Sequence, residues 1–248
     1  MCGRYTYLLT WDDIRHLYGL TAQGAESADG GGGGGASEAA PPDFRRRYNH
    51  APTERAPVVR IKDGRRELVM LRWGWGKPSW SPNREWINAR SEGIATSRHY
   101  ADSFRLRRCL IPVSGYYEWR KMPSGRRAPH WIGMTDRSPF ALAGIWKEVL
   151  DRKTGELQDQ YLVITCQPNS LLAAIHDRMP LIIDVADYDA WLAGDPPPLH
   201  LLRSFPAERM TAYEVSTKIN KAGYDEPDIL DPAPRIDEGP AASQLPLD

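Results

Sequence analysis

A succession of short strand-like segments that begins at residue 56 constrains the fold of this chain more than any other feature of its sequence. Residues 56–62 and 66–73 flank Asp63-Gly64, and such a turn between two apolar runs is typical of a β-hairpin. Further runs of the same kind cover residues 109–121, 130–134, 140–149, 160–166 and 209–216. Because these runs do not alternate with long helices, we predict a single α+β domain with a largely antiparallel, strongly curved sheet.

Short helices are predicted around this sheet. Residues 10–19 start with a capping-box pattern formed by Thr10 and Asp13, and Gly19 is suited to end the helix. Three more short helices are expected at residues 97–108, 169–175 and 186–193, and residues 123–125 predict a turn.

Two segments lack the apolar residues needed to fold. Residues 21–43 contain a run of glycines at 30–35, small residues and a Pro-Pro pair, so we expect a disordered surface insertion. A phosphate-binding loop instead needs spaced glycines between a strand and a helix, with a Lys-Ser/Thr ending. Residues 225–248 are rich in Pro and Asp and predict a loose tail, which leaves residues 1–224 as the folded domain.

The charge is balanced overall but not along the chain. There are 32 basic and 32 acidic side chains, which excludes a polycation that coats nucleic acid. Residues 1–130 carry 22 basic and 13 acidic side chains, a net charge of +9, whereas residues 131–248 carry 10 and 19, a net charge of −9. This asymmetry indicates an anionic partner for the first half.

The sequence carries no membrane or secretion signal. No apolar run approaches the roughly 18 residues of a membrane helix, and the N-terminus does not have the pattern of a signal peptide. Cys2, Cys109 and Cys166 are odd in number and show neither disulfide nor zinc spacing. We therefore expect a cytoplasmic protein with reduced thiols, no membrane partner, no metal and no other cofactor.

Cys2 is the residue with the most specific chemistry. Once Met1 is removed, its α-amine and its thiol share one carbon frame. Such an amine forms an imine with an aldehyde, and the thiol then closes a five-membered thiazolidine ring, which an internal cysteine cannot do. A thiolate at this position could also perform acyl chemistry. On its position alone, Cys2 is more simply explained as an accidental second residue.

Three other motifs combine polar groups that catalyse proton transfer. Asn88 opens Asn-Ala-Arg-Ser-Glu after an apolar pair, Glu118 lies in the aromatic segment Gly-Tyr-Tyr-Glu-Trp, and His176 precedes Asp-Arg-Met-Pro. Burial would raise the pKa of Glu118 towards neutrality, and histidine is a proton shuttle at physiological pH. Taken singly, these motifs could also be a charged turn, the exposed face of a strand and an ordinary loop.

The ordered set of motifs resembles the SRAP family, the SOS-response-associated peptidase-like proteins. The resemblance covers roughly residues 1–220 except the glycine-rich insertion. It is carried by Met1-Cys2-Gly3-Arg4-Tyr5, Arg47-Tyr48-Asn49-His50-Ala51-Pro52, Arg72-Trp73-Gly74, Asn88-Ala89-Arg90-Ser91-Glu92, Arg108-Cys109-Leu110-Ile111-Pro112, Gly115-Tyr116-Tyr117-Glu118-Trp119, Ala143-Gly144-Ile145-Trp146 and Ile175-His176-Asp177-Arg178-Met179-Pro180.

The resemblance implies a fold and an activity. The implied fold is a compact α+β domain around a barrel-like antiparallel sheet. The implied activity is the binding of single-stranded DNA and the covalent trapping of abasic sites, with a possible lyase side reaction. The residues implied to be catalytic are Cys2 as the crosslinking nucleophile, Asn88 as a holding amide, Glu118 in proton transfer and His176 in imine chemistry.

The resemblance also implies the DNA contacts. The residues expected at phosphates or beside the lesion are Arg4, Asn49, Arg90, Arg98 and Arg178, with Trp75 or Trp80 as the wedging aromatic. We expect a monomer in the bacterial cytoplasm that is nucleoid-associated when bound to DNA. Two other functions stay open: a Cys2-dependent peptidase acting on itself or on other chains, and a non-catalytic module that binds single-stranded DNA.

Overall fold

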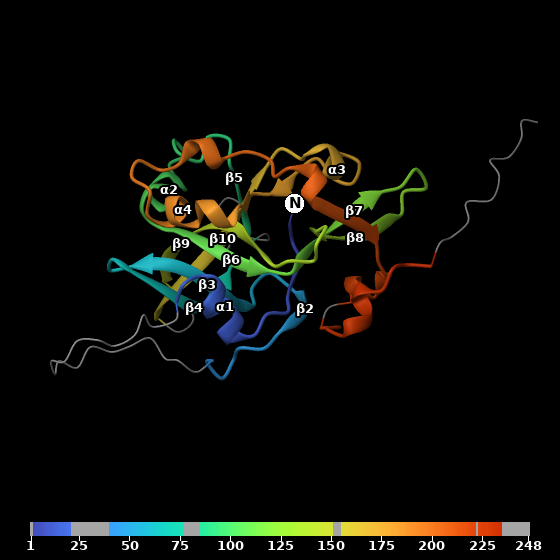
Figure 1. The fold of residues 1–248 in the computed structure, drawn as a ribbon, viewed down its shortest axis with the longest axis horizontal. Coiled ribbons are helices and arrows are strands. Elements are labelled where there is room, and N and C mark those ends of the chain that lie inside the picture. Colours follow the sequence, from blue (N-terminus) through green and yellow to red (C-terminus); the bar gives the residue numbers. More distant parts are fainter. Residues whose placement is uncertain (1, 21–39, 77–84, 151–154, 222, 235–248) are drawn as a thin grey trace, which may run out of the picture.

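The sequence folds into two β-sheets (Figure 1). The computed structural model describes residues 2–20, 40–76, 85–150, 155–221 and 223–234. The first sheet has the order β13 (Met210–Glu214), β8 (Arg127–Met134), β7 (Gly115–Lys121), β1 (Tyr5–Tyr7) and β2 (Arg47–His50), and all of its neighbours are antiparallel.

The second sheet closes into a barrel. Its order is β11 (Met179–Pro180), β10 (Leu157–Cys166), β4 (Arg65–Trp73), β3 (Arg55–Lys62), β6 (Arg108–Val113), β9 (Phe140–Leu150) and β12 (Ile182–Ile183), with β5 (Asn88–Arg90) beside β10. Because β10 pairs with both β4 and β9, five strands form a closed ring. Strand β10 runs parallel to β4 and β5, and the other pairs are antiparallel. The predicted α+β fold with a curved, barrel-like sheet is confirmed.

The helices around the barrel are short, as predicted, and shorter than the predicted ranges. The α-helices are α1 (Trp11–Leu17), α2 (Ala101–Leu106), α3 (Ser170–Ala173) and α4 (Tyr188–Ala193). Single 3-10 turns are η1 (Val185–Asp187), η2 (Leu199–Leu201), η3 (Ala207–Arg209), η4 (Thr217–Asn220) and η5 (Pro227–Leu230). Both contacts of the predicted capping box of α1 are present, from Thr10 to Asp13 and back. No helix in the described ranges is long and apolar enough to span a membrane.

The prediction of one continuous strand over residues 109–121 is wrong. Ser114 interrupts it, because its backbone N–H donates to the carbonyl of Thr6 at 2.8 Å and its hydroxyl accepts from the N–H of Leu8 at 2.9 Å. The chain therefore leaves the barrel after β6 and enters the other sheet as β7. This crossing brings the motif around Glu118 next to the N-terminal segment, with Tyr5 opposite Tyr116.

The expected loose tail does not begin at residue 225. The carboxylate of Asp225 accepts the backbone N–H groups of Tyr48 and Asn49, both at 2.7 Å, and pairs with Arg47 at 2.6 Å. Ile229 of η5 is fully buried in a second apolar cluster on the outer side of β7 and β8. Residues 225–234 are thus part of the fold. Residues 235–248, and residues 21–39 of the predicted insertion, lie outside the described residues.

Candidate active site

Cys2 lies at the inner end of the N-terminal segment, against the barrel. Tyr5 pairs with Tyr116, and the backbone N–H of Tyr117 donates to the carbonyl of Arg4 at 2.9 Å, so the segment continues along β7. Cys2 is fully buried in the main core cluster. Its carbonyl accepts a hydrogen bond from Nδ2 of Asn88 at 2.8 Å. The Asn88 amide of β5 therefore fixes the backbone of Cys2, the residue predicted to carry the nucleophile.

The surroundings of Cys2 keep its thiol protonated. Burial raises the pKa of the Cys2 thiol well above its ordinary value, and the negative charge of Glu118 raises it further. A thiolate is thus disfavoured in this closed site. A protonated thiol can still add to an imine carbon when a neighbouring base receives its proton.

Glu118 is the buried carboxyl group of the site. It is 2% exposed, and burial raises its pKa above the ordinary value. Its Oε2 lies 3.8 Å from Nε2 of His176. Strand alternation places Glu118 on the same face of β7 as Tyr116, whose hydroxyl is also buried. The sequence left the exposed and buried placements open, and the structure shows the buried one.

Nδ1 of His176 has a hydrogen-bond partner whether the ring is neutral or charged. In the neutral ring, Nδ1 accepts the backbone N–H of Arg178 at 3.0 Å, which leaves the proton on Nε2, towards Glu118. In the charged ring, Nδ1 can instead donate to Oδ1 of Asp177, 2.9 Å away. His176 can therefore give or take a proton beside Glu118 without leaving its position.

Arg178 is committed to contacts within the protein. Its guanidinium donates to both carboxylate oxygens of Glu92, at 2.6 and 2.8 Å, and to the carbonyl of Thr165 at 2.7 Å. The Arg178 hydrogen bonds lower the pKa of Glu92 to about 2. These contacts lock the loop that carries His176 onto β5 and β10. The sequence placed Arg178 at a DNA phosphate, and its partner Glu92 was missed because the two lie 86 residues apart.

Arg4 and Asn49 are also engaged with each other. Nη1 of Arg4 donates to Oδ1 of Asn49 at 2.6 Å, and Nδ2 of Asn49 donates to the carbonyl of Tyr224 at 2.8 Å. Asn49 is 3% exposed, so its side chain supports Arg4 rather than facing solvent. Of this pair, Arg4 is the partly exposed member.

The remaining predicted DNA contacts differ in exposure. Arg90 and Arg98 are exposed, and Arg98 donates to the ring of His99 at 3.0 Å. Trp75 is 7% exposed, and its indole N–H donates to the carbonyl of Gln160 at 3.0 Å. The proposed wedge at Trp75 is therefore wrong for this conformation, since a wedge needs an exposed ring. Trp80 lies outside the described residues.

The structure connects the four predicted catalytic residues through a chain of neighbours. Asn88 holds the carbonyl of Cys2, the charge of Glu118 raises the pKa of the Cys2 thiol, and Nε2 of His176 lies 3.8 Å from Oε2 of Glu118. Within the described residues, no three His, Cys, Asp or Glu side chains come together in a way that could hold a metal ion. Sequence reasoning gave no place to Tyr116, which is fully buried two residues before Glu118 on the same face of β7.

Known proteins match the chain over nearly its whole length. The family model of SOS response associated peptidase (SRAP) matches residues 1–222. The abasic site processing protein YoqW of Bacillus subtilis is 29% identical over 240 residues, which cover 93% of this chain and 99% of YoqW. YobE of the same organism, with the same description, is 30% identical over 89% of this chain and 96% of its own length.

More distant matches agree with these. The abasic site processing protein YedK of Escherichia coli is 30% identical over 146 residues, 59% of this chain and 64% of YedK. A solved structure from Bacteroides thetaiotaomicron has a TM-score of 0.66 at 27% identity, over 75% of this chain and 85% of that one. The resemblance inferred from the motifs is confirmed, and the chain belongs to the SRAP (SOS response associated peptidase) family.

Proposed function

We propose that this protein processes abasic sites in DNA by forming a covalent bond between Cys2 and the lesion. The printed names of its relatives describe abasic site processing, and the observation that carries the proposal is the placement of Cys2. Its backbone carbonyl is held by Asn88, and its thiol is buried near enough to Glu118, a buried carboxyl group paired with His176, to feel its charge. The proposed substrate is single-stranded DNA, in which the sugar of the lesion can reach a buried residue.

The chemistry proceeds in balanced steps after Met1 is removed. A proton moves between the sugar and Glu118 as the closed sugar opens to its aldehyde. The α-amine of Cys2 attacks the aldehyde carbon, and loss of one water gives an imine. The Cys2 sulfur then adds to the imine carbon, its proton passes to the nitrogen, and a thiazolidine results. Glu118 and His176 can carry these protons, because they face each other at 3.8 Å.

Asn88 has a second group available for the substrate. Its Oδ1 is buried and has no hydrogen-bond partner in the described part of the chain. An unsatisfied buried acceptor costs about 1–3 kcal/mol. A hydroxyl of the opened sugar, or the freed amine of Cys2, would supply the missing donor. The Asn88 side chain would then hold the Cys2 carbonyl through Nδ2 and the sugar or the amine through Oδ1.

Ring closure also decides between crosslinking and cleavage. An imine at the former aldehyde carbon promotes β-elimination, which breaks the strand. Addition of the neighbouring thiol removes the imine, so the lyase reaction is expected as a minor side reaction. Removing the thiol while keeping the α-amine, as in Cys2→Ala or Cys2→Ser, should therefore shift the product from a stable adduct to a cleaved strand.

The test is incubation with a single-stranded oligonucleotide that holds one abasic site, followed by denaturing electrophoresis. The wild type is expected to give a shifted band, and Cys2→Ala is expected to give none. Cys166→Ala is the matched control, since it removes a different buried thiol and should leave the band unchanged. A fusion that blocks the α-amine of Cys2 should also abolish the band. A shifted band of normal intensity in Cys2→Ala would refute the proposal.

Two alternative functions give different results in related assays. A cysteine peptidase needs a reactive thiolate, whereas the raised pKa of the Cys2 thiol supports chemistry that starts from the amine. Hydrolysis of an unrelated peptide that is lost in Cys2→Ala would favour the peptidase. Equal affinity for intact and abasic strands, without a covalent product, would favour a non-catalytic binding module.

A further inference from the structure

The hairpin formed by β7 and β8 ends in a concentration of positive charge. Past Glu118, the two strands and their turn carry Arg120, Lys121, Arg126 and Arg127, all of them exposed. We call these four residues the hairpin tip. Figure 1 shows the hairpin extending away from the barrel strands towards the right-hand edge of the fold.

Most of this charge is not neutralised within the protein. Lys121 is the direct cross-strand neighbour of Arg127, and like charges in such a pair destabilise the ladder. Arg126 pairs with Glu214 at 2.9 Å, with both side chains more than 30% exposed. In the described residues, no carboxylate pairs with the other three cations of the hairpin tip. The hairpin tip therefore keeps a net charge of about +3, which an external anion would stabilise.

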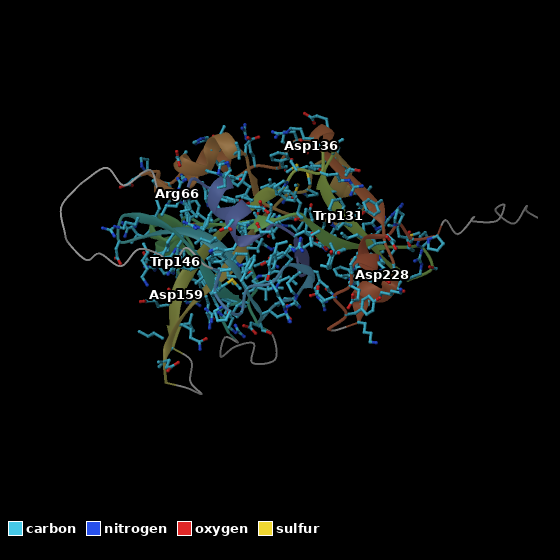
Figure 2. The ribbon with its side chains drawn as sticks, turned by 60° about the horizontal axis from the view of Figure 1, so that its bottom comes forward. Arg66, Trp131, Asp136, Trp146, Asp159 and Asp228 are labelled. Atoms are coloured by element: carbon cyan, nitrogen blue, oxygen red, sulfur yellow. The ribbon has the colours of Figure 1, made fainter. Side chains whose placement is uncertain are left out.

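The hairpin of β3 and β4 shows that basic side chains at a hairpin end are not generally left without acidic partners in this protein. Its end has the same arrangement, with Lys62 opposite Arg65. There, however, Lys62 pairs with Asp159 at 3.5 Å, and Arg66 pairs with Asp189. Figure 2 shows Arg66 and Asp159 on one side of the molecule and Trp131 of β8 on the other. Two of the three cations at the end of the β3–β4 hairpin thus have an acidic partner, against one of the four cations of the hairpin tip.

The β7–β8 hairpin, which has more unpaired cations, is also the one that carries Glu118, the proposed catalytic carboxyl group. Arg120 follows Glu118 by two residues, on the same face of β7. At a rise of about 3.3 Å per residue, Arg120 starts about 7 Å along the strand from Glu118 on the same face, and Lys121 about 10 Å along it on the opposite face, beside Arg127. A strand of DNA whose lesion lies at Glu118 would pass the hairpin tip within its next few phosphates.

We infer that the hairpin tip is a phosphate-binding track for the DNA flank on one side of the abasic site. The inference rests on the proposed function, and it adds a binding surface outside the group of residues around Cys2. Arginine and lysine contact phosphates without reading the bases, so the track serves any sequence. It also supplies free cations on this side of the site, where Arg178 and Asn49 are held by internal contacts.

The experiment compares two triple variants that remove the same charge from opposite hairpins. Arg120→Ala/Lys121→Ala/Arg127→Ala removes the track, and Lys62→Ala/Arg65→Ala/Arg66→Ala is the matched control. Binding is measured against salt with single strands that hold a tetrahydrofuran analogue, which has no aldehyde and forms no crosslink. One strand extends only to the 5′ side of the analogue and the other only to the 3′ side. Circular dichroism melting verifies that both variants are folded.

The track variant should lose at least about tenfold in affinity at 0.15 M salt, and its salt slope should fall by about 2, at about 0.7 per phosphate contact. This loss should occur with one of the two flanks, and the control should lose affinity with neither. An unchanged slope, or an equal loss with both flanks, would overturn the inference. Crosslinking of true abasic strands is measured separately, so a wild type that binds but forms no adduct contradicts the proposed function and not the track.

Discussion

Arg178→Ala tests whether Arg178 contacts a DNA phosphate, as the sequence suggested, or holds the fold through Glu92 and Thr165, as the structure indicates. The variant loses the bidentate contact with Glu92, whose side chain is 48% exposed, and this pair is worth about 0.5–1 kcal/mol. It also loses a charge-assisted hydrogen bond to the carbonyl of Thr165, worth about 1.5–2 kcal/mol. That carbonyl keeps the N–H of Ser91 at 2.8 Å as a second donor, so it is not orphaned. The expected loss is about 2–3 kcal/mol, or roughly 4–12 °C in the melting temperature.

The stability difference should depend on pH in a defined direction. The hydrogen bonds of Arg178 hold the pKa of Glu92 at about 2, below its unfolded value of about 4.3. A lowered carboxyl pKa stabilises the fold above the unfolded value, and this stabilisation is lost as the pH falls through about 2. Wild type and Arg178→Ala should therefore differ fully above pH 5 and less towards pH 2. Arg209→Ala, which breaks the exposed pair with Asp184, is the control and should cost under about 1 kcal/mol.

Arg178→Lys tests the functional side of the same prediction. It keeps the positive charge but cannot form the two-pronged contact with Glu92. If Arg178 positions His176 through the loop, crosslinking at saturating DNA should slow about tenfold while the affinity for an intact strand stays unchanged. A normal crosslinking rate in Arg178→Lys, together with a salt slope reduced by about 0.7 in Arg178→Ala, would show instead that Arg178 contacts a phosphate.

Three other substitutions test separate parts of the structure. Burial raises the pKa of Glu118, so the free energy of unfolding of the wild type should fall as the pH rises through that raised pKa. In Glu118→Gln, denaturation at pH 4 and at pH 8 should no longer show this fall, and crosslinking should be slower. Gly144→Ala places a Cβ 2.9 Å from the carbonyl of Leu162 inside the barrel and should cost about 1–3 kcal/mol in urea unfolding. Asp225→Ala leaves two backbone N–H groups of β2 without their acceptor and should cost about 3 kcal/mol; a neutral result would mean that residues after 224 are not part of the fold.

The fold class followed from the sequence because the strand-like runs after residue 56 are long and bounded by turns. Five short strands were missed, because two to four residues are too few for a period to show. They are β1 (Tyr5–Tyr7), β2 (Arg47–His50), β5 (Asn88–Arg90), β11 (Met179–Pro180) and β12 (Ile182–Ile183). The break at Ser114 was also missed. Residues on both sides of it are apolar, and the reason for the break is a contact with Thr6, far away in the sequence.

The site was predictable in its residue types and not in its pairings. Burial of Glu118 could not be derived from alternation, because β7 is covered on both faces and apolar residues occupy both. The engagement of Arg178 depends on Glu92, and that of Asn49 on Tyr224, which are pairings between distant segments. Composition also misled at residues 225–234, where one buried isoleucine and one aspartate are sufficient to anchor a polar segment.

Intact-protein mass spectrometry after incubation with an abasic single strand tests the central claim most directly. The predicted product is one adduct whose mass equals the protein without Met1 plus the oligonucleotide minus one water, with fragmentation placing the link on Cys2. Thiazolidine closure also predicts that borohydride leaves this mass unchanged, whereas an open imine would gain two hydrogens. An adduct on a lysine, a borohydride-reduced imine as the main product, or no adduct at all would contradict the account.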